Sequence, residues 1–94
     1  MSNTKYVVYA RIFKAMCDEN RLRILDYLKE KEHNASELLE KLDFGQSTLS
    51  HHMSLLLDAG VVESRKHGKW TIYRLNPAAY EKMMEWMKGY LERG

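Results

Sequence analysis

The sequence is poor in cysteine and proline, and it has no long hydrophobic run. Its one cysteine, Cys17, excludes an intramolecular disulfide and a zinc or redox site of the Cys-x-x-Cys kind. Secreted domains of this size usually carry several cysteines. Residues 1–14 mix Tyr, Val, Lys and Arg, without the apolar run of a signal peptide or a membrane span. We therefore expect a cytoplasmic protein with no membrane partner.

The groups that catalysis requires are also missing. We find no paired carboxylates, no nucleophile beside a base and no phosphate-binding glycine loop, so we expect neither an enzyme nor a bound cofactor. The chain has 94 residues, 45% of them hydrophobic, which predicts a single domain over residues 1–94. A chain this short gains stability when it pairs with a second copy.

What the sequence does contain begins with a series of helical periods. Apolar spacing predicts a helix around residues 9–16 and a second at 19–31, after the capping residue Asp18. A third helix follows Asn34, where Glu37 stands in the position of a capping box. The expected inward side chains of the second and third helices are Leu22, Leu25, Leu28, Leu38, Leu39 and Leu42.

The second half of the chain changes period. A fourth helix is predicted at 46–59, with Leu49, Met53 and Leu56 inward, and Gly60 fits the position just after it. Strands are predicted at 61–66 and 70–75, joined by a tip at 67–69. Asn76 and Pro77 then mark the start of a last helix. The expected fold is mainly α with a small β-hairpin, in the order α-α-α-α-β-β-α of a winged helix-turn-helix.

The predicted fourth helix has an unusual outer surface. Its one acidic residue is Asp58, at the far end, although a solvated helix face usually carries Lys and Glu. Short uncharged side chains can hydrogen-bond to base edges in a major groove without repelling phosphates. Alternatively, they only cap and solvate the helix. The candidate base-reading residues are Gln46, Ser47, Thr48, Ser50, His51 and Ser54.

Positive charge is concentrated in the predicted hairpin. The formal net charge of the chain is only +2, yet residues 61–75 carry four basic residues against one acidic residue. Such a hairpin can neutralise phosphates and fix the register on a duplex. Alternatively, its charges guard exposed strands against aggregation. The candidate backbone contacts are Arg65, Lys66, His67 and Lys69.

Two apolar stripes, on the first and last predicted helices, exceed what a small core can cover. We expect them to form a homodimer interface. Adaptable Met and aromatic side chains could also line a small hydrophobic ligand site. The stripe residues are Tyr9, Ile12, Phe13, Met16, Tyr80, Met83, Met84, Met87 and Leu91.

Three runs of sequence resemble the ArsR/SmtB family of bacterial and archaeal repressors. They are residues 17–25 (CDENRLRIL), 46–53 (QSTLSHHM) and 68–77 (GKWTIYRLNP). The resemblance implies a dimeric repressor that binds an imperfect palindrome in double-stranded DNA and usually releases it when an inducer binds. It places the recognition helix at 46–57 and the wing at 61–75.

The sequence departs from this family at its metal sites. Many members bind metals through a Cys-Val-Cys pair at the start of the third helix, where this chain has Asn34 and Ser36. Others bind zinc on the last helix through Asp and His, and residues 77–94 contain neither. Adjacent residues on a helix point about 100° apart, so His51 and His52 cannot share an ion within one chain. We expect no metal site.

The residues leave the signal and some alternatives open. We expect Cys17 to be a small buried hydrophobe, and a thiol sensor is the alternative. A metal site that joins Cys17, His33 or His67 between subunits is not excluded by spacing. A winged-helix interaction module controlled by a protein partner, or a regulator that responds to a small ligand, would have the same pattern.

Overall fold

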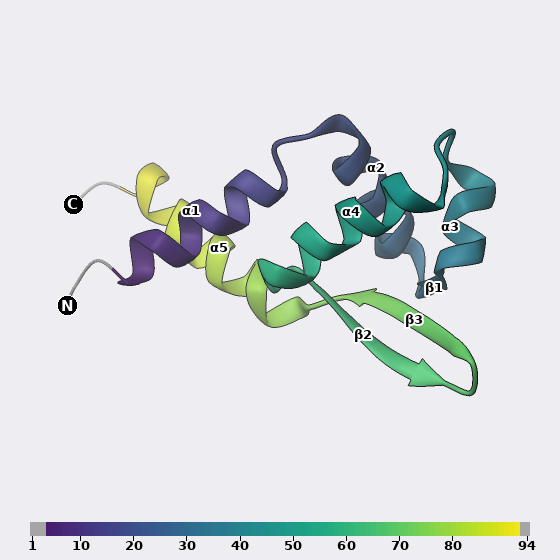
Figure 1. Cartoon of the computed structure of the whole chain (residues 1–94). Helices are drawn as coiled ribbons and strands as arrows, with labels where there is room; N and C mark the ends of the chain where they lie inside the picture. Colours follow the sequence, from purple (N-terminus) through teal and green to yellow (C-terminus); the bar gives the residue numbers. More distant parts are fainter. Residues whose placement is uncertain (1–3, 93–94) are drawn as a thin grey trace.

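The computed structural model describes residues 4–92 (Figure 1). It is elongated, with principal extents of 49 × 24 × 21 Å. The start of α1 and the end of α5 lie at the same end of the molecule, while the hairpin projects from the other part. No helix within residues 4–92 is long and apolar enough to cross a membrane. The elements are α1 (Thr4–Ala15), α2 (Glu19–Glu30), β1 (His33–Asn34), α3 (Ala35–Lys41), α4 (Gln46–Asp58), β2 (Val62–His67), β3 (Trp70–Leu75) and α5 (Pro77–Leu91).

The predicted capping residues of α2 and α3 are confirmed. The Asp18 carboxylate accepts hydrogen bonds from the backbone N–H groups of Asn20 and Arg21, at 2.8 and 3.2 Å. Asn34 and Glu37 form a reciprocal capping box, with both side chain to backbone distances at 2.8 Å. These bonds satisfy N–H groups that have no partner inside a helix. They fix where α2 and α3 begin, and thereby the approach of the chain to α4.

The sheet differs from the predicted hairpin by one strand. It has three antiparallel strands in the order β1-β3-β2, and β1 pairs His33 with Tyr73. A two-residue strand has no period that a sequence pattern can reveal. The hairpin is also tighter than predicted, because His67 pairs with Trp70. The turn is left to Gly68 and its neighbour, and Gly68 adopts the positive φ of 63° that favours glycine.

The core is formed by helices α1 to α5 together with the start of β2. The expected inward residues of α4 are buried, but the phase of α2 was wrong at its start: Leu22 is 47% exposed and Ile24 is fully buried. Leu25 and Leu28 share the buried face with Ile24, so the helix is rotated relative to the predicted stripe. The buried hydrophobic residues are Ile12, Ala15, Ile24, Leu25, Leu28, Leu38, Leu42, Leu49, Met53, Leu56, Val61, Val62 and Met83.

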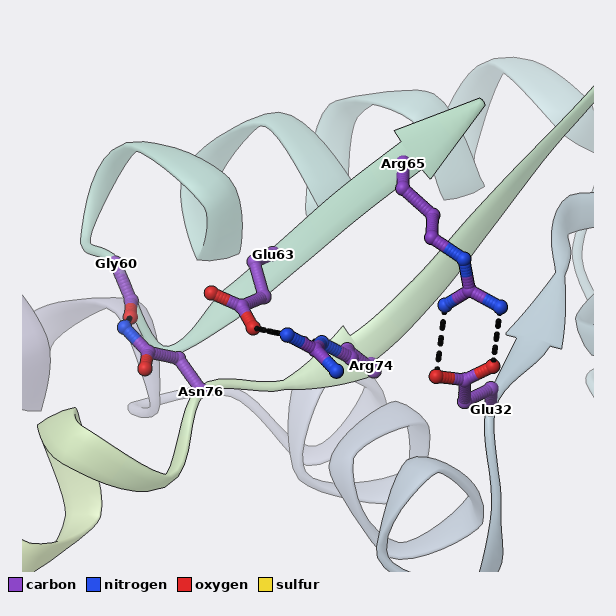
Figure 2. Close-up of polar contacts among 6 residues, drawn as sticks. All are labelled: Glu32, Gly60, Glu63, Arg65, Arg74 and Asn76. Atoms are coloured by element: carbon purple, nitrogen blue, oxygen red, sulfur yellow. Dashed lines mark hydrogen bonds and ion pairs between the residues drawn. The ribbon is translucent and has the colours of Figure 1, made fainter. Parts of the chain in front are cut away.

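The junction between the hairpin and α5 is held by hydrogen bonds from one residue, Asn76. Asn76 is the N-cap residue of α5 and Pro77 follows it, as predicted. The Asn76 side chain does not cap the helix but donates from Nδ2 to the carbonyl oxygen of Gly60, at 2.9 Å (Figure 2). Its backbone N–H donates to Val61. The end of α4 and the start of α5 are therefore tied together across the base of the hairpin.

Candidate nucleic-acid interface

Helix α4 presents two chemically distinct faces. Leu49, Met53 and Leu56 are buried in the core, whereas the six candidate base-reading residues are all exposed. Within residues 4–92 the six side chains form no hydrogen bond or ion pair, so their donors and acceptors are available to an outside partner. Those residues are Gln46, Ser47, Thr48, Ser50, His51 and Ser54.

The N-terminal end of α4 carries no acidic residue in its first turn. Its N-cap is Gly45, which has no side chain to occupy the first N–H groups. Those N–H groups and the positive end of the helix dipole favour an anion such as a backbone phosphate. The candidate base-reading residues at this end, Gln46 and Ser47, therefore lie beside backbone N–H groups that favour an anion.

His52 fixes α4 against α2. The Arg21 guanidinium can only donate, so the 3.1 Å contact from its Nη1 makes His52 Nδ1 the acceptor of a neutral imidazole. The His52 ring also packs on Phe44 of the α3–α4 turn, with ring centroids 5.5 Å apart. Burial lowers the pKa of His52, although Asp18 opposes this shift. Sequence reasoning did not identify Arg21 as the partner of His52.

The wing is the β2–β3 hairpin, and its basic residues fall into two groups. Lys66, His67 and Lys69 are exposed towards the tip. Lys66 makes no ion pair within the described chain. The Lys69 ammonium lies 5.4 Å from the ring centroid of Trp70, which is itself 45% exposed. A cation held over an exposed ring remains accessible to a phosphate.

The other wing cations are already paired, as Figure 2 shows. Arg65 binds Glu32 in a bidentate arrangement, with N–O distances of 2.8 and 2.9 Å, and Arg74 pairs with Glu63 at 2.6 Å. The hydrogen bonds between Arg65 and Glu32 lower the pKa of Glu32 and raise the pKa of Arg65. Sequence reasoning missed Glu32, because 33 positions separate it from Arg65 and only the β1–β3 pairing brings them together.

A second surface extends along α1 and α5. The Trp86 ring of α5 stacks on Tyr9 of α1 with ring centroids 4.7 Å apart, and this contact joins the two helices. Within α5, Trp86 also packs edge-on against Tyr90 at 5.2 Å. Exposed large apolar residues remain on the outside of this pair. They are Tyr6, Val7, Val8, Met84, Met87, Tyr90 and Leu91.

This surface corrects the predicted dimer stripes. Ile12 and Met83 are only 4% and 5% exposed and belong to the core of the single chain, so they offer no surface to a partner. Their predicted neighbours Tyr9, Phe13, Met16 and Tyr80 are half-buried, whereas Met84, Met87 and Leu91 are exposed. Burial without a hydrogen-bond partner raises the pKa of Tyr80 to about 12. The freely exposed part of the stripes is therefore the outer face of α5 and the start of α1.

The residues considered for metal or thiol chemistry lie apart. Cys17 is exposed, in contrast to the predicted buried position, because it follows the end of α1 and begins the turn to α2. His33 is buried on β1, and both of its ring nitrogens lack a hydrogen-bond partner. Among the residues described, no three His, Cys, Asp or Glu side chains gather to hold a metal ion.

Comparisons with known proteins agree with this geometry. A family model for bacterial regulatory proteins of the arsR family matches residues 18–64, from α2 into β2. The arsenical resistance operon repressor of Staphylococcus xylosus is 45% identical over 71 residues, which cover 76% of this chain and 68% of that protein.

Solved structures share the fold. An ArsR-like transcriptional regulator from Rhodococcus sp. RHA1 has a TM-score of 0.86 and 30% identity, covering 96% of this chain and 83% of that one. The homodimeric winged helix-turn-helix DNA-binding domain of Mb0332 from Mycobacterium bovis has a TM-score of 0.78 at 22% identity, covering 97% and 86%. At that identity the second likeness speaks for the fold alone.

Proposed function

This chain belongs to the arsR family of bacterial regulatory proteins and is a winged helix-turn-helix transcriptional repressor, and we propose that it acts as a homodimer on an imperfect palindrome. Such regulators are not enzymes, in agreement with the sequence. In the proposal, α4 enters the major groove and the wing contacts the DNA backbone. The dimer occludes promoter DNA, and its two copies of α4 read the two halves of the operator.

The exposed polar face of α4 is the observation that carries this proposal. Six neutral hydrogen-bonding side chains without internal partners stand on a helix that is firmly packed on its other side. A protein-binding face would instead expose large apolar anchors. We assign base reading to Ser47, Thr48, Ser50 and His51, with Gln46 near the helix start and Ser54 one turn further along.

The wing supplies contacts that carry no sequence information. Lys66, His67 and Lys69 surround the hairpin tip, where they can reach the phosphates flanking the major groove. Arg65 can add to them only by leaving or sharing Glu32. The wing therefore contributes affinity and register, and its contribution is expected to fall as salt is added.

Dimerisation is proposed through α5 and the start of α1. Exposed Met87 and Leu91, at 50% and 85%, would be unusual on a monomer surface when clustered with Tyr90 and Met84. The homodimeric Mycobacterium bovis domain has the same fold. A stable interface of this kind buries about 1,200 Å² or more in total. Sedimentation that shows a monomer at micromolar concentration would contradict the proposal.

We propose that the signal is not a metal ion bound at the usual family positions. Asn34, the N-cap residue of α3, and Ser36 within α3 offer an amide and a hydroxyl, which bind zinc, cadmium or arsenite poorly. The test is to titrate the DNA-bound protein with each ion. Release near one ion per subunit that is abolished by Ser36→Ala would overturn the proposal, whereas release abolished by Cys17→Ser or His33→Ala would identify the site between subunits that residue spacing leaves open. Release only at large excess would indicate nonspecific binding.

A mobility shift on the promoter region next to the gene tests the function itself. The wild-type protein should retard this DNA at a concentration where unrelated DNA of equal length remains free. Replacing Ser50 and His51 by Ala should abolish this preference. Lys29→Ala, on the exposed side of α2, is the matched control and should leave it intact. Equal retardation of both DNAs by the wild type would contradict specific repression.

A further inference from the structure

A hollow of about 820 Å³ lies between α1, α2 and α4. Its apolar walls include Ala10 of α1 and Leu55 of α4. Val7, which also belongs to the proposed dimer surface, lines the hollow as well. This volume lies in the range of small-molecule sites and exceeds what a bare phosphate or sulfate ion would fill. An occupant that matches the hollow therefore has an apolar body.

The charged residues around the hollow have one dominant sign. Arg11, Lys14 and Arg21 line it, against the one acidic residue Asp58. Within residues 4–92, neither Arg11 nor Lys14 nor Asp58 takes part in an ion pair. Arg21 is held by its Nε–H, which donates to the Ala15 carbonyl, and by its contact to His52. Excess positive charge beside low-dielectric walls attracts an anion.

A second hollow of similar size has a different balance of charge. It has a volume of about 910 Å³ and lies on α5, among the exposed residues proposed for the dimer. Its charged residues are Glu81, Glu85 and Lys88, so the acidic groups outnumber the basic one. The two hollows are thus similar in size and opposite in charge.

We propose that the hollow between α1 and α4 binds a small organic carboxylate, with its apolar body against Ala10 and Leu55 and its head group at Lys14 and Arg11. The assignment rests on the proposed function, since it makes this carboxylate the effector of the repressor. Leu55 and Asp58 belong to the same helix as the base-reading residues. A ligand that bridges α1 and α4 therefore changes how α4 is held relative to the dimerisation helices.

The test uses octanoate as probe on the full-length protein, followed by calorimetry and by amide chemical shifts. We expect one octanoate per chain and shifts in α1 and the end of α4. Two control compounds should bind at least about tenfold more weakly, because each can make only one of the two kinds of contact. 1-Octanol lacks the charge, and inorganic phosphate lacks the apolar body.

Matched variants locate the site. Lys14→Gln, at an exposed position, should weaken octanoate binding about five- to tenfold by removing one charge-assisted contact. Lys88→Gln, at the other hollow, should leave it unchanged. Octanoate binding that is absent, that survives Lys14→Gln and Arg11→Gln, or that is lost in Lys88→Gln would overturn the assignment. So would a hollow that the second copy fills in the dimer, seen as amide protection of α1 in the absence of octanoate.

The effector role is read from DNA binding with and without saturating octanoate. We expect the affinity for operator DNA to change at least several-fold in the wild type and to stay constant in Lys14→Gln. An unchanged wild-type affinity would overturn the effector role. Specific DNA binding without octanoate tests the repressor proposal separately, so the failure of one is distinguishable from the failure of the other.

Discussion

Helix α4 and the wing, the two elements proposed to contact DNA, differ in whether their side chains already have partners. The polar groups on the outer face of α4 have no hydrogen-bond or ion-pair partners within the described chain, whereas half of the wing's basic residues are already paired. Arg65 is bound by Glu32 and Arg74 by Glu63, while Lys66 and Lys69 form no ion pair within residues 4–92. The positive charge that stands out in the sequence is therefore only partly available to phosphates.

This difference separates the two roles. Neutral donors and acceptors on a rigid helix lose little when they leave water for base edges of matching geometry, and they distinguish bases through that geometry. Free ammonium groups on a hairpin act mainly through charge, which any sequence satisfies. The paired arginines hold the wing in place against β1 and within the sheet. The predictions below test this division, from the largest expected effect to the smallest.

Replacing His51 by Ala should relax base discrimination by about 1–3 kcal/mol for a well-formed contact. The reason is that the proposal assigns a base-edge contact to the exposed imidazole of His51, and alanine cannot make this contact. The measurement is a competition between operator DNA and single-base variants. If the variant lost affinity equally for every sequence, His51 would contact the DNA backbone and not a base, and the division of roles between α4 and the wing would be wrong.

Replacing Lys66 and Lys69 together by Gln should weaken binding to all sequences. Each lost phosphate contact should reduce the slope of log K against log salt by about 0.9. The slope is measured from about 50 to 300 mM salt, and the base preference should stay as in the wild type. Lys29→Gln on α2 is the control for a change of net charge alone. A double variant with an unchanged slope would remove the wing tip from the interface.

Replacing Glu32 by Gln should tighten binding about two- to threefold at low salt, because it frees Arg65 and removes a carboxylate near the DNA backbone. The opposite result, weaker binding, would show that the pair acts by positioning the wing. A charge exchange, Glu32→Arg with Arg65→Glu, separates the two explanations. The exchange restores an ion pair that can position the wing, but it places a carboxylate on the wing. DNA affinity should therefore stay near the wild-type value only if the pair acts by positioning the wing.

These predictions depend on contacts that the sequence pattern could not supply. Helix starts were predictable because capping uses neighbours such as Asn34 and Glu37, only three positions apart. The pairs Glu32–Arg65 and Arg21–His52 join residues more than thirty positions apart, and no local pattern encodes such contacts. The exposed position of Cys17 likewise depends on how the turn after α1 leaves the core.

The composition of the candidate site was predictable, but which of its side chains are already paired was not. Short uncharged side chains on one helix face identified α4, because charge and side-chain size can be read directly from sequence. Whether Arg65 is free could not be read, since it depends on the two-residue strand β1, which shows no period. The α1 and α5 stripes were predictable as apolar, yet Ile12 and Met83 belong to the core because α1 and α5 also pack on their own chain.

The smallest expected effect concerns pH, and it distinguishes α4 from the wing once more. The pKa of His52 in the folded protein lies below its ordinary value because the ring is buried. In the unfolded chain the same imidazole has its ordinary pKa of about 6.5. The unfolded state then binds the proton first as pH falls. The stability that neutral His52 provides is fully present above about pH 7, and it is lost progressively below about pH 6.5, until the pH passes the folded-state pKa.

The measurement is the free energy of unfolding by urea between pH 7.5 and 5, for the wild type and for His52→Gln. Glutamine keeps an acceptor for Arg21 but does not titrate, so the decline towards pH 5 should be shallower in the variant. Asp18, whose pKa is lowered chiefly by a hydrogen bond from the Arg21 backbone, affects stability only at lower pH. His51→Gln is the matched control on the exposed face. If His52→Gln declined as steeply as the wild type, the imidazole would not be the group whose neutrality holds α4 against α2.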